Sequence, residues 1–328
     1  MKRFAHLVFT TSIAVSLVSG LGSQWVFAQA WPVKPVRLVV PQPAGGPTDS
    51  VGRIFAAMLA DVLGQTVIVE NRTGAGGTIG AASVAKSKPD GYTLLVASPG
   101  ITSIAPHLYP QLGYDTLNDF THLALLSRVG TVLVVHPALP VKSVGDLLRM
   151  AKARPGQINM ASGGNGTVSH LTGELFKSTA GVNLVHVPYK GSGPAATEVM
   201  AGQVEMMFLI TNEALSFVRS NKLRALAVTG ASRSPHLPTL PTVAEAGLPG
   251  FVSETWFGIS GPAGMPADIA SRVTSAATQG VQRTEWRERL ERSGFEIATA
   301  GADEFTRHIR AEIEKWGRIV RQSGAKVE

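Results

Sequence analysis

Two glycine-rich turns are the parts of this sequence best suited to bind a small anion. The first is Pro41–Asp49, with the sequence PQPAGGPTD, and the second is Ser162–His170, with the sequence SGGNGTVSH. Each turn lies between a short apolar run and an amphipathic one, as a turn from a strand to a helix would. The first N–H groups of a helix have no partner within it, and the helix dipole favours negative charge there. The sequence therefore predicts two anion-binding helix starts.

In the first turn, the glycines and the capping residues have two possible roles: to bind a ligand or to form a structural turn. Gly45 and Gly46 permit a ligand to approach the backbone closely, because neither carries a side chain. Thr48 or Asp49 can cap the helix that follows. A structural turn with a good cap explains this motif as well as a ligand does, so the motif alone leaves both interpretations open.

The second turn favours a ligand more strongly. A cap needs one polar residue, whereas this turn has a run of small or polar residues in which Ser162, Asn165 and Thr167 supply neutral hydrogen-bond groups. Gly166 lies directly before Thr167, the expected cap. We interpret His170, in the first turn of the helix, as a supporting residue, because no nucleophile is visibly placed beside it.

Other chemistry-bearing motifs are weak or absent from the sequence. The run Gly74–Gly80 has the spacing G-x-G-x-x-x-G, which is not the dinucleotide fingerprint G-x-G-x-x-G. The sequence contains no H-E-x-x-H, no G-x-S-x-G and no phosphate-binding G-K-[ST], and its eight histidines do not have metal-ligand spacing. We therefore expect a protein that has no catalytic residues, no metal and no cofactor.

Short β-rich runs that alternate with amphipathic helices must position these turns, which argues for an α/β architecture. Continuous apolar runs such as Leu94–Ala97 favour a parallel sheet covered on both faces. The expected helices include Val51–Leu63, ended by Gly64, and a last helix over Asp303–Gln322. The expected strands are Val36–Val40, Thr66–Glu70, Tyr92–Ala97, His122–Leu126, Thr131–Val135, Ile158–Ala161, Leu184–Val187, Val204–Phe208, Leu223–Thr229 and Trp256–Ser260.

The first thirty residues have the pattern of a secretory signal peptide. Lys2 and Arg3 precede the mostly apolar stretch Leu7–Val18, and small residues offer cleavage after Ala28 or Ala30. A membrane anchor is the alternative, but this stretch is too short and too rich in Ser and Thr to span a bilayer comfortably. The absence of cysteine excludes disulfides, thiolate metal sites and a lipidated N-terminal cysteine. We expect a soluble protein of the periplasm.

Length and charge further limit the possibilities. A mature chain of 298 residues (328 minus 30) favours two domains. Candidate hinges at Arg128–Gly130 and Gly247–Thr255 predict one domain over residues 31–129 plus 255–328 and a second over 130–254. The net charge of +7, or +5 without Lys2 and Arg3, is scattered, so we expect no nucleic-acid partner. A modest positive field helps to attract anions.

The sequence closely resembles the substrate-binding proteins of tripartite tricarboxylate transporters, the Bug family, over essentially the whole mature chain. The matching blocks are Leu38–Pro41 with Gly45, Gly46 and Asp49, then Val69–Gly77, Asp90–Leu95, Ser162–Leu171, His186–Gly191, Leu223–Thr229 and Pro241–Gly247. The resemblance implies a two-domain periplasmic binding fold, similar to the type II class, with a discontinuous first domain and the ligand in the cleft between the domains. It also implies that the ligand is passed to an integral membrane permease.

The resemblance also implies a set of ligand-binding residues. Gly45, Gly46, Thr48 and Asp49 would hold one end of a small organic carboxylate, and Ser162, Asn165, Gly166 and Thr167 the other, partly through bound water. Ser98, in a third cleft loop, and Tyr189 are weaker additions to this set.

One departure from the family pattern bears on the ligand. Many members have Asp-Asn after Met206–Phe208, where this chain has Leu209 and Ile210. Because an ammonium group would lose a counter-charge there, the hypothesis at this point is a carboxylate without an amino group. A periplasmic hydrolase or isomerase and a ligand sensor for a membrane signalling protein are the alternative functions. We expect a monomer.

Overall fold

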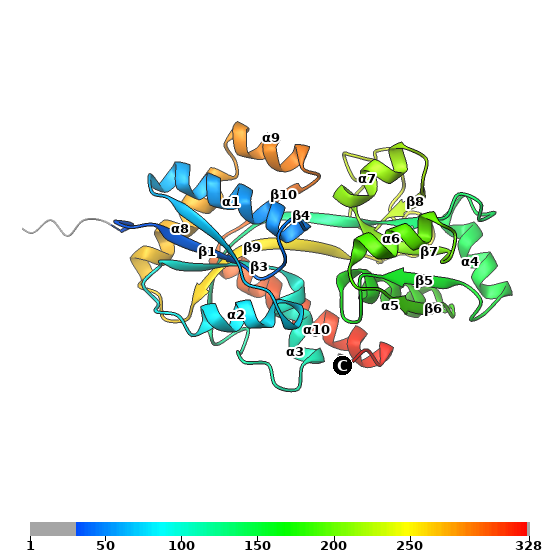
Figure 1. Cartoon of the computed structure of the whole chain (residues 1–328), viewed down its shortest axis with the longest axis horizontal. Helices are drawn as coiled ribbons and strands as arrows, with labels where there is room; N and C mark the ends of the chain where they lie inside the picture. The colour runs from blue at the N-terminus through cyan, green and yellow to red at the C-terminus, as the bar shows by residue number, and fades with distance from the viewer. Residues whose placement is uncertain (1–30, 327–328) are drawn as a thin grey trace, which may run out of the picture. The chain divides into compact units, whose positions relative to one another are not determined.

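Figure 1 shows a computed structural model, which describes residues 31–326; the predicted signal peptide lies outside the described residues. The strands are β1 Val36–Val40, β2 Val67–Asn71, β3 Thr93–Ala97, β4 Phe120–Val135, β5 Asn159–Ser162, β6 Val185–Pro188, β7 Met206–Ile210, β8 Arg224–Val228, β9 Glu254–Pro262 and β10 Glu296–Ala300. Their order is β2-β1-β3-β9-β4-β7-β5-β6, and β8 and β10 also pair with β4.

The helices lie between the strands, as the alternating sequence pattern predicts. They are α1 Pro47–Leu63, α2 Thr78–Ala85, α3 Ala105–Leu108, α4 Val144–Ala153, α5 Val168–Ala180, α6 Ser192–Met200, α7 Thr211–Arg219, α8 Ala267–Gly280, α9 Thr284–Arg292 and α10 Ala302–Ser323, with a 3₁₀ turn at Ala75–Gly77 and a π turn at Gly100–Ile104. Gly64 ends α1 with a left-handed φ of 66°, and Thr167 caps α5 with its side chain, as expected. Ser143 caps α4 in the same way.

Two lobes share the long strand β4 (Figure 1). Up to Gly130, β4 pairs with β9, and from Thr131 onward it pairs with β7 and β8. We call the part around β1, β2, β3, β9 and β10 the first lobe and the part around β5 to β8 the second lobe. Each lobe has its own apolar core, one around Phe55 and Phe257 and the other around Phe176 and Phe208. The domain boundaries stay a prediction that agrees with this change of pairing.

The sheet differs from the expected parallel one. Parallel pairing is found in β1–β2, β1–β3, β5–β6 and β5–β7, whereas β4 and β9 run antiparallel to their neighbours. The segments His122–Leu126 and Thr131–Val135, predicted as two strands, are parts of β4. One strand can serve both lobes because bulges and register shifts let it bend along its length.

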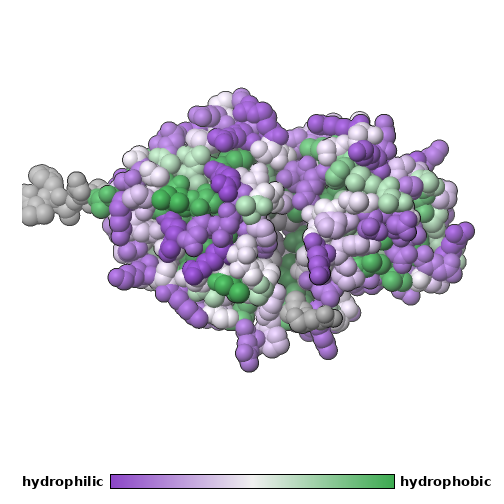
Figure 2. All heavy atoms as spheres, viewed as in Figure 1, coloured by the Kyte–Doolittle hydropathy of each residue, from purple (hydrophilic) through white to green (hydrophobic). Residues whose placement is uncertain are grey.

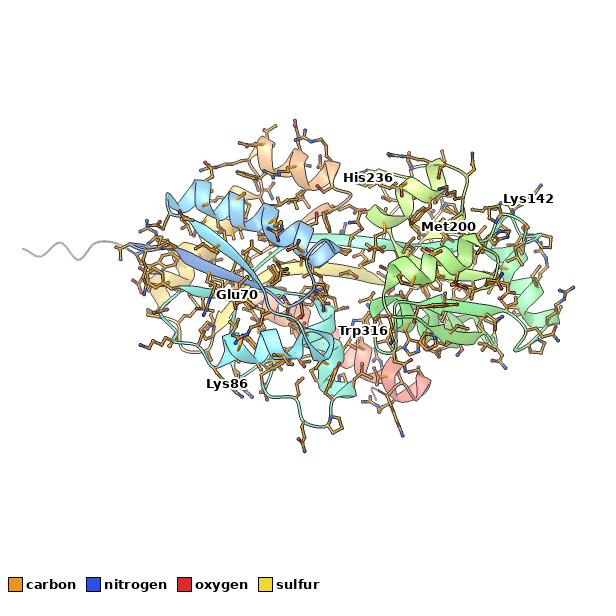
Figure 3. The ribbon with its side chains drawn as sticks, viewed as in Figure 1. Glu70, Lys86, Lys142, Met200, His236 and Trp316 are labelled. Atoms are coloured by element: carbon orange, nitrogen blue, oxygen red, sulfur yellow. The ribbon has the colours of Figure 1, made fainter. Side chains whose placement is uncertain are left out.

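The last helix joins the two lobes. Trp316 of α10 is fully buried against Ile104 and Leu108 of the first lobe and Leu171 of α5 in the second. Figure 3 shows Trp316 near the middle of the molecule, where α10 reaches the second lobe. This packing places the start of α5, which carries the second glycine-rich turn, opposite the first lobe.

Candidate ligand-binding site

A cavity of about 450 Å³ lies between the lobes and is lined by both glycine-rich turns. Figure 2 shows the molecule hollowed at this place, with apolar atoms visible inside. The first lobe contributes Gln42, Pro43, Gly46, Pro47, Thr48, Gly76, Ser98, Pro99, Gly100, Ile104, Leu108, Tyr109, Thr255 and Phe257 to the lining. The second lobe contributes Gly163, Asn165, Gly166, Thr167, Val168, Ser169, Gly191, Ser192, Phe208, Leu209, Ile210 and Glu213.

In the first turn, the start of α1 faces the cavity. Gly46 is the N-cap in an extended conformation, Pro47 follows at the first helical position, and both line the cavity with Thr48. Proline has no N–H, so Thr48 offers the first backbone donor of this helix. Within residues 31–326, neither the N–H nor the hydroxyl of Thr48 has a hydrogen-bond partner. Thr48 therefore presents two donors to a ligand.

Asp49 braces this turn from behind and does not line the cavity. Its carboxylate accepts from Gly45 N–H at 2.9 Å, Arg53 Nε at 2.9 Å and Asn71 Nδ2 at 2.8 Å. Burial alone would raise the pKa of Asp49, but the hydrogen bonds from Arg53, Gly45 and Asn71 together lower it below its usual value. Gly45 and Asp49, both predicted to touch the ligand, are thus engaged with the protein instead.

In the second turn, the start of α5 faces the cavity from the opposite lobe. Thr167 caps the helix by accepting from His170 N–H, which leaves the N–H groups of Val168 and Ser169 without a protein acceptor among the described residues. Asn165 lines the cavity, and its side-chain amide has no partner in the described part of the chain. The helix start therefore offers free backbone donors, but of the polar side chains predicted to supply neutral groups only Asn165 is free in the described part of the chain, since Thr167 Oγ1 donates to the carbonyl of Gly164 at 2.8 Å.

The glycine amides of the second turn are occupied by protein groups. Gly163 N–H donates to Ser169 Oγ at 3.2 Å and Gly164 N–H donates to Ser162 Oγ at 3.1 Å. Gly166 N–H donates to His170 Nδ1 at 3.1 Å and has a φ of 75°, a left-handed conformation that favours glycine. These bonds fix the shape of the turn, so its free donors are held in place before a ligand arrives.

Two histidines support the second turn. The rings of His170 and His186 stack at a centroid distance of 3.8 Å and an interplanar angle of 11°. Burial lowers the pKa of His170 to about 3 and that of His186 to about 4. A neutral His170 forms no ion pair with Glu174, whose carboxylate lies 3.7 Å away and bonds Lys177 at 2.8 Å. Neutrality also lets His170 Nδ1 accept from the turn.

Ser162 and His186 resemble a nucleophile and a base but are not placed to act on a ligand. Ser162 Oγ lies 2.6 Å from His186 Nε2. Ser162 is fully buried and does not line the cavity. Tyr189 does not line it either; burial, with a contribution from Glu198, raises its pKa. Both residues, predicted as ligand contacts, lie outside the cavity wall.

Six of the ten predicted residues line the cavity: Gly46, Thr48, Ser98, Asn165, Gly166 and Thr167. Ser98 follows β3, and its carbonyl accepts from the N–H and hydroxyl of Thr102. The Ser98 hydroxyl itself has no hydrogen-bond partner among residues 31–326. Tyr109, which the sequence did not nominate, lies beside Gly76 on the same wall, and burial raises its pKa so that it stays a donor. Most of the remaining wall is apolar.

Glu213 is the main site residue that sequence reasoning missed. It lies in the first turn of α7 and is the one charged side chain on the cavity wall among the described residues. Its Oε1 accepts from Ser192 Oγ at 3.0 Å, and its Oε2 is buried without a partner. Thr255 Oγ1, from β9 in the same lining, is also buried without a partner. Burial raises the pKa of Glu213, although the bond from Ser192 opposes this.

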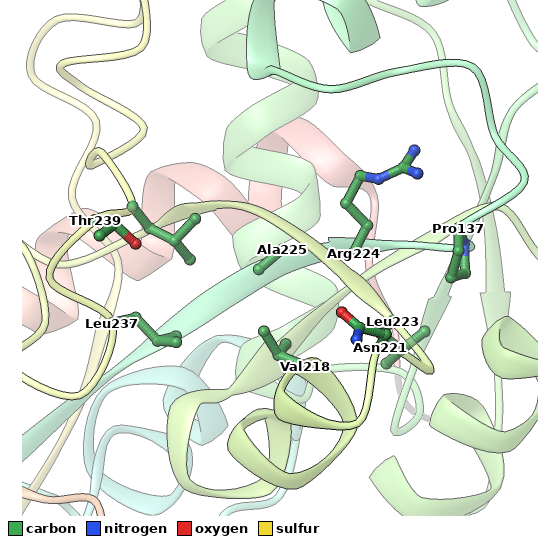
Figure 4. Close-up of a pocket in the computed structure, with 9 residues that line it drawn as sticks. Pro137, Val218, Asn221, Leu223, Arg224, Ala225, Leu237 and Thr239 are labelled. Carbon is green, nitrogen blue, oxygen red and sulfur yellow. The ribbon is translucent and has the colours of Figure 1, made fainter.

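A smaller cavity of about 290 Å³ lies in the second lobe, between α7, β8 and the Leu237–Leu240 loop (Figure 4). Figure 4 shows the Arg224 guanidinium turned away from Leu237 and Val218. Arg224 Nη1 donates to the carbonyls of Leu139 and Val141, both at 3.0 Å. The backbone therefore engages the one charged side chain among the described residues that line this cavity.

The described residues contain no group of His, Asp or Glu arranged to hold a metal ion. In the same part of the chain, no helix is both long and apolar enough to cross a membrane.

Comparisons with known proteins find a matching family model and relatives over most of the chain. A family model described as "Tripartite tricarboxylate transporter family receptor" matches residues 51–325. Protein BugT of Bordetella pertussis is 37% identical over 304 residues, which cover 92% of this chain and 93% of BugT.

Solved structures of related proteins share this fold over most of the chain. The structure of R. palustris Rpa4515 with adipate has a TM-score of 0.82 and 36% identity, covering 90% of this chain and all of that one. The structure of MatC from Rhodopseudomonas palustris with bound malate has a TM-score of 0.76 and 34% identity, covering 88% of this chain and 99% of that one. The fold is therefore that of a two-domain periplasmic binding protein with its cleft between the domains.

Proposed function

The chain belongs to the tripartite tricarboxylate transporter receptor family, and from that premise we propose that it is a periplasmic receptor that captures a small organic carboxylate between its lobes. The observation that carries this proposal is the meeting of two helix starts with free donors, one from each lobe, on a single cavity. Adipate and malate, the ligands of two related structures, are both small carboxylates.

The donors divide between the lobes. From the first lobe, the N–H and hydroxyl of Thr48 and the hydroxyl of Ser98 would bind a carboxylate. From the second lobe, the N–H groups of Val168 and Ser169 and the amide of Asn165 would bind it. A hydrogen bond to a charged group contributes about 1.5–3 kcal/mol, so several together reach micromolar affinity without a cationic side chain. A ligand that touches both lobes stabilises their closed arrangement.

Gly45, Asp49, Ser162 and Tyr189 take indirect roles in this proposal. Asp49 and Ser162 accept hydrogen bonds from the glycine amides of their own turns, and so hold the donors in position. Tyr189 anchors the second turn through its N–H, which donates to the carbonyl of Ser162 at 2.9 Å.

Transport rather than chemistry is the proposed role. Among the described residues, the cavity lining contains no nucleophile paired with a base, and the buried Ser162–His186 pair lies outside it. The receptor, exported as a monomer by its signal peptide, would deliver the unchanged ligand to the integral membrane permease of a tripartite transporter.

A thermal-shift screen tests this function. The mature protein is heated alone and with acetate, malate, adipate, citrate or benzoate, and each ligand is then recovered and analysed by mass spectrometry. A true ligand at a hundred times its Kd stabilises the folded state by about 2.7 kcal/mol, which gives a clear rise in Tm. We expect at least one carboxylate to raise Tm and to be recovered unchanged. The absence of any shift, or consumption of the ligand, would contradict the proposal.

A further inference from the structure

Glu213 is an unusual residue for a cavity that binds anions. A carboxylate in the lining repels a ligand carboxylate, and the described lining contains no Lys, Arg or His to compensate for it. The side chain is not turned out to solvent, since burial shields it and leaves Oε2 without a partner. A buried polar atom without a partner is rare in folded proteins and calls for an explanation.

Burial raises the pKa of Glu213, and two features of its surroundings partly offset this by stabilising the ionised form. Ser192 Oγ donates to Oε1 at 3.0 Å, and Glu213 lies in the first turn of α7, where the helix dipole favours negative charge. Its own N–H donates to Asn212 Oδ1 at 3.0 Å. The position is also fixed, because Thr211, two residues earlier, donates its hydroxyl to the carbonyl of Gly130 at 2.7 Å. Glu213 is therefore held against the cavity by the start of α7.

The charges in the cavity discriminate between classes of ligand. With Glu213 ionised, a dicarboxylate would bring two more negative charges into a lining without a cationic side chain. A ligand with one carboxylate and one ammonium group would instead pair its positive charge with Glu213. The free donors of Thr48, Val168 and Ser169 would still hold its carboxylate.

We propose that Glu213 is a specificity-determining residue that binds a cationic nitrogen of the ligand, so that this receptor selects amino-carboxylates over dicarboxylates. This inference rests on the proposed carboxylate-binding function and names its substrate class. An ammonium group would donate to Glu213 Oε2, and Thr255 Oγ1 is a second unpartnered oxygen of the lining that can accept a hydrogen bond. It replaces the sequence-based hypothesis of a ligand without an amino group, which followed from Leu209. In this chain the acidic side chain near the ligand is Glu213, which lies on α7 four positions after Leu209.

Calorimetry with matched ligands tests the proposal on the wild-type protein. One set is 4-aminobutyrate, pentanoate and glutarate, which differ only in the group at one end of the same chain. Two further sets vary the distance between the ends: glycine with propanoate and malonate, and 6-aminohexanoate with heptanoate and pimelate. We expect the best-fitting amino-carboxylate to bind about tenfold or more tightly than both of its partners, as a charged hydrogen bond predicts.

Glu213→Gln removes the charge while it keeps the shape of the side chain. We expect it to weaken the amino-carboxylate about tenfold or more, whereas the matched alkyl carboxylate should bind at least as tightly as it does to wild type, because the repulsion by Glu213 is removed. Glu198→Gln is the control, because Glu198 lies on the neighbouring helix α6 in the same lobe but does not line the cavity. We expect this control to leave every affinity unchanged.

Two outcomes would overturn this inference alone. In one, a dicarboxylate is the tightest ligand of its set and Glu213→Gln weakens it, which would show a protonated Glu213 that donates to a carboxylate. In the other, Glu213→Gln leaves the preference within each set unchanged. If instead no carboxylate of any set binds to the folded wild-type protein, the proposed function itself fails.

Discussion

The turn of the first lobe is braced by a buried carboxylate, whereas the turn of the second lobe is braced by a neutral imidazole and hydroxyl groups. Behind the start of α1, the Asp49 carboxylate accepts hydrogen bonds from Gly45 N–H, Arg53 and Asn71. Behind the start of α5, His170 and the hydroxyl of Ser162 accept from the glycine amides. Gly45 N–H in the first turn and the N–H groups of Gly163, Gly164 and Gly166 in the second are used internally. Among the described residues, Gly46 N–H and the first helical residues keep the free donors. The glycines therefore shape the site more than they bind the ligand.

The two braces differ in their response to acid. The pKa of Asp49 is lowered, so its contribution to stability is present above the usual value of 3.8 and is lost as pH falls below that value. The pKa values of His170 and His186 are lowered from 6.5 to about 3 and about 4. Their contribution is present above pH 6.5 and declines as pH falls from 6.5, because the unfolded chain takes up protons first. The second turn is thus the more acid-sensitive.

The largest expected effect on binding follows from Gly166→Pro. Proline cannot adopt the left-handed φ of 75°, and it removes the N–H that His170 accepts. We expect a loss of affinity of about a hundredfold or more for the best carboxylate, measured by calorimetry on protein whose fold is verified by circular dichroism. Gly166→Ala keeps the N–H and should cost less, on the order of 1–2 kcal/mol from the left-handed conformation alone. Unchanged affinity in a folded Gly166→Pro protein would remove this turn from the site.

Asp49→Ala tests the brace of the first turn. The change leaves Gly45 N–H, Arg53 and Asn71 without their acceptor. We therefore expect the free energy of unfolding, measured in urea, to fall by about 2 kcal/mol and the ligand affinity to fall about tenfold. Asp49→Asn keeps one acceptor oxygen and should lose about half of that stability. If both variants bind as tightly as wild type, the pre-formed shape of the first turn does not matter for binding.

His170→Leu and His170→Asn form the matched pair for the second turn. Leucine removes the acceptor for Gly166 N–H, and we expect a loss of about 1–2 kcal/mol in the free energy of unfolding. The asparagine side chain can accept this hydrogen bond in place of Nδ1, so the free energy of unfolding of His170→Asn should fall less. Because neither residue titrates, both variants should lose less stability than wild type between pH 6.5 and pH 4. An unchanged pH profile would show that His170 does not set the acid sensitivity of this turn.

Glu213→Gln has the smallest expected effect on stability, since Glu213 belongs to neither turn. A raised pKa means that Glu213 favours the folded state below its usual value of 4.5, and that this contribution is lost as pH rises through the folded-state value. At neutral pH we therefore expect the ligand-free variant to be more stable than wild type, by on the order of 1 kcal/mol. A less stable variant would show that the ionised carboxylate stabilises the empty protein, contrary to this account.

Sequence reasoning recovered the regular elements because their signals are local. Val36–Val40 was predicted with the observed bounds, and Gly64 ends α1 as expected. A local signal can also mislead: Thr242 and Glu245 form the reciprocal bonds of a capping box, both at 3.0 Å, but these residues close a turn and not a helix. β10 was missed because Glu296–Ala300 is half-exposed and only weakly apolar, and its place in the sheet comes from pairing with β4.

The site was only partly predictable, for a physical reason. A polar residue in a glycine-rich turn can point into the cavity, as Thr48 does, or back into the protein, as Asp49 and Ser162 do, and residue type does not distinguish these directions. Glu213 had no motif around it, and only the fold brings the start of α7 to the cavity. The family pattern drew attention to Leu209, which does line the cavity, but it is silent on the nearby acid.

A crystal structure of the mature protein with its tightest carboxylate ligand tests the central claim most directly. We expect the carboxylate oxygens within about 2.7–3.1 Å of the N–H groups of Thr48 and of Val168 or Ser169, so that both lobes contact one ligand. A carboxylate held by lysine or arginine side chains elsewhere, or by the residues of one lobe alone, would contradict the account.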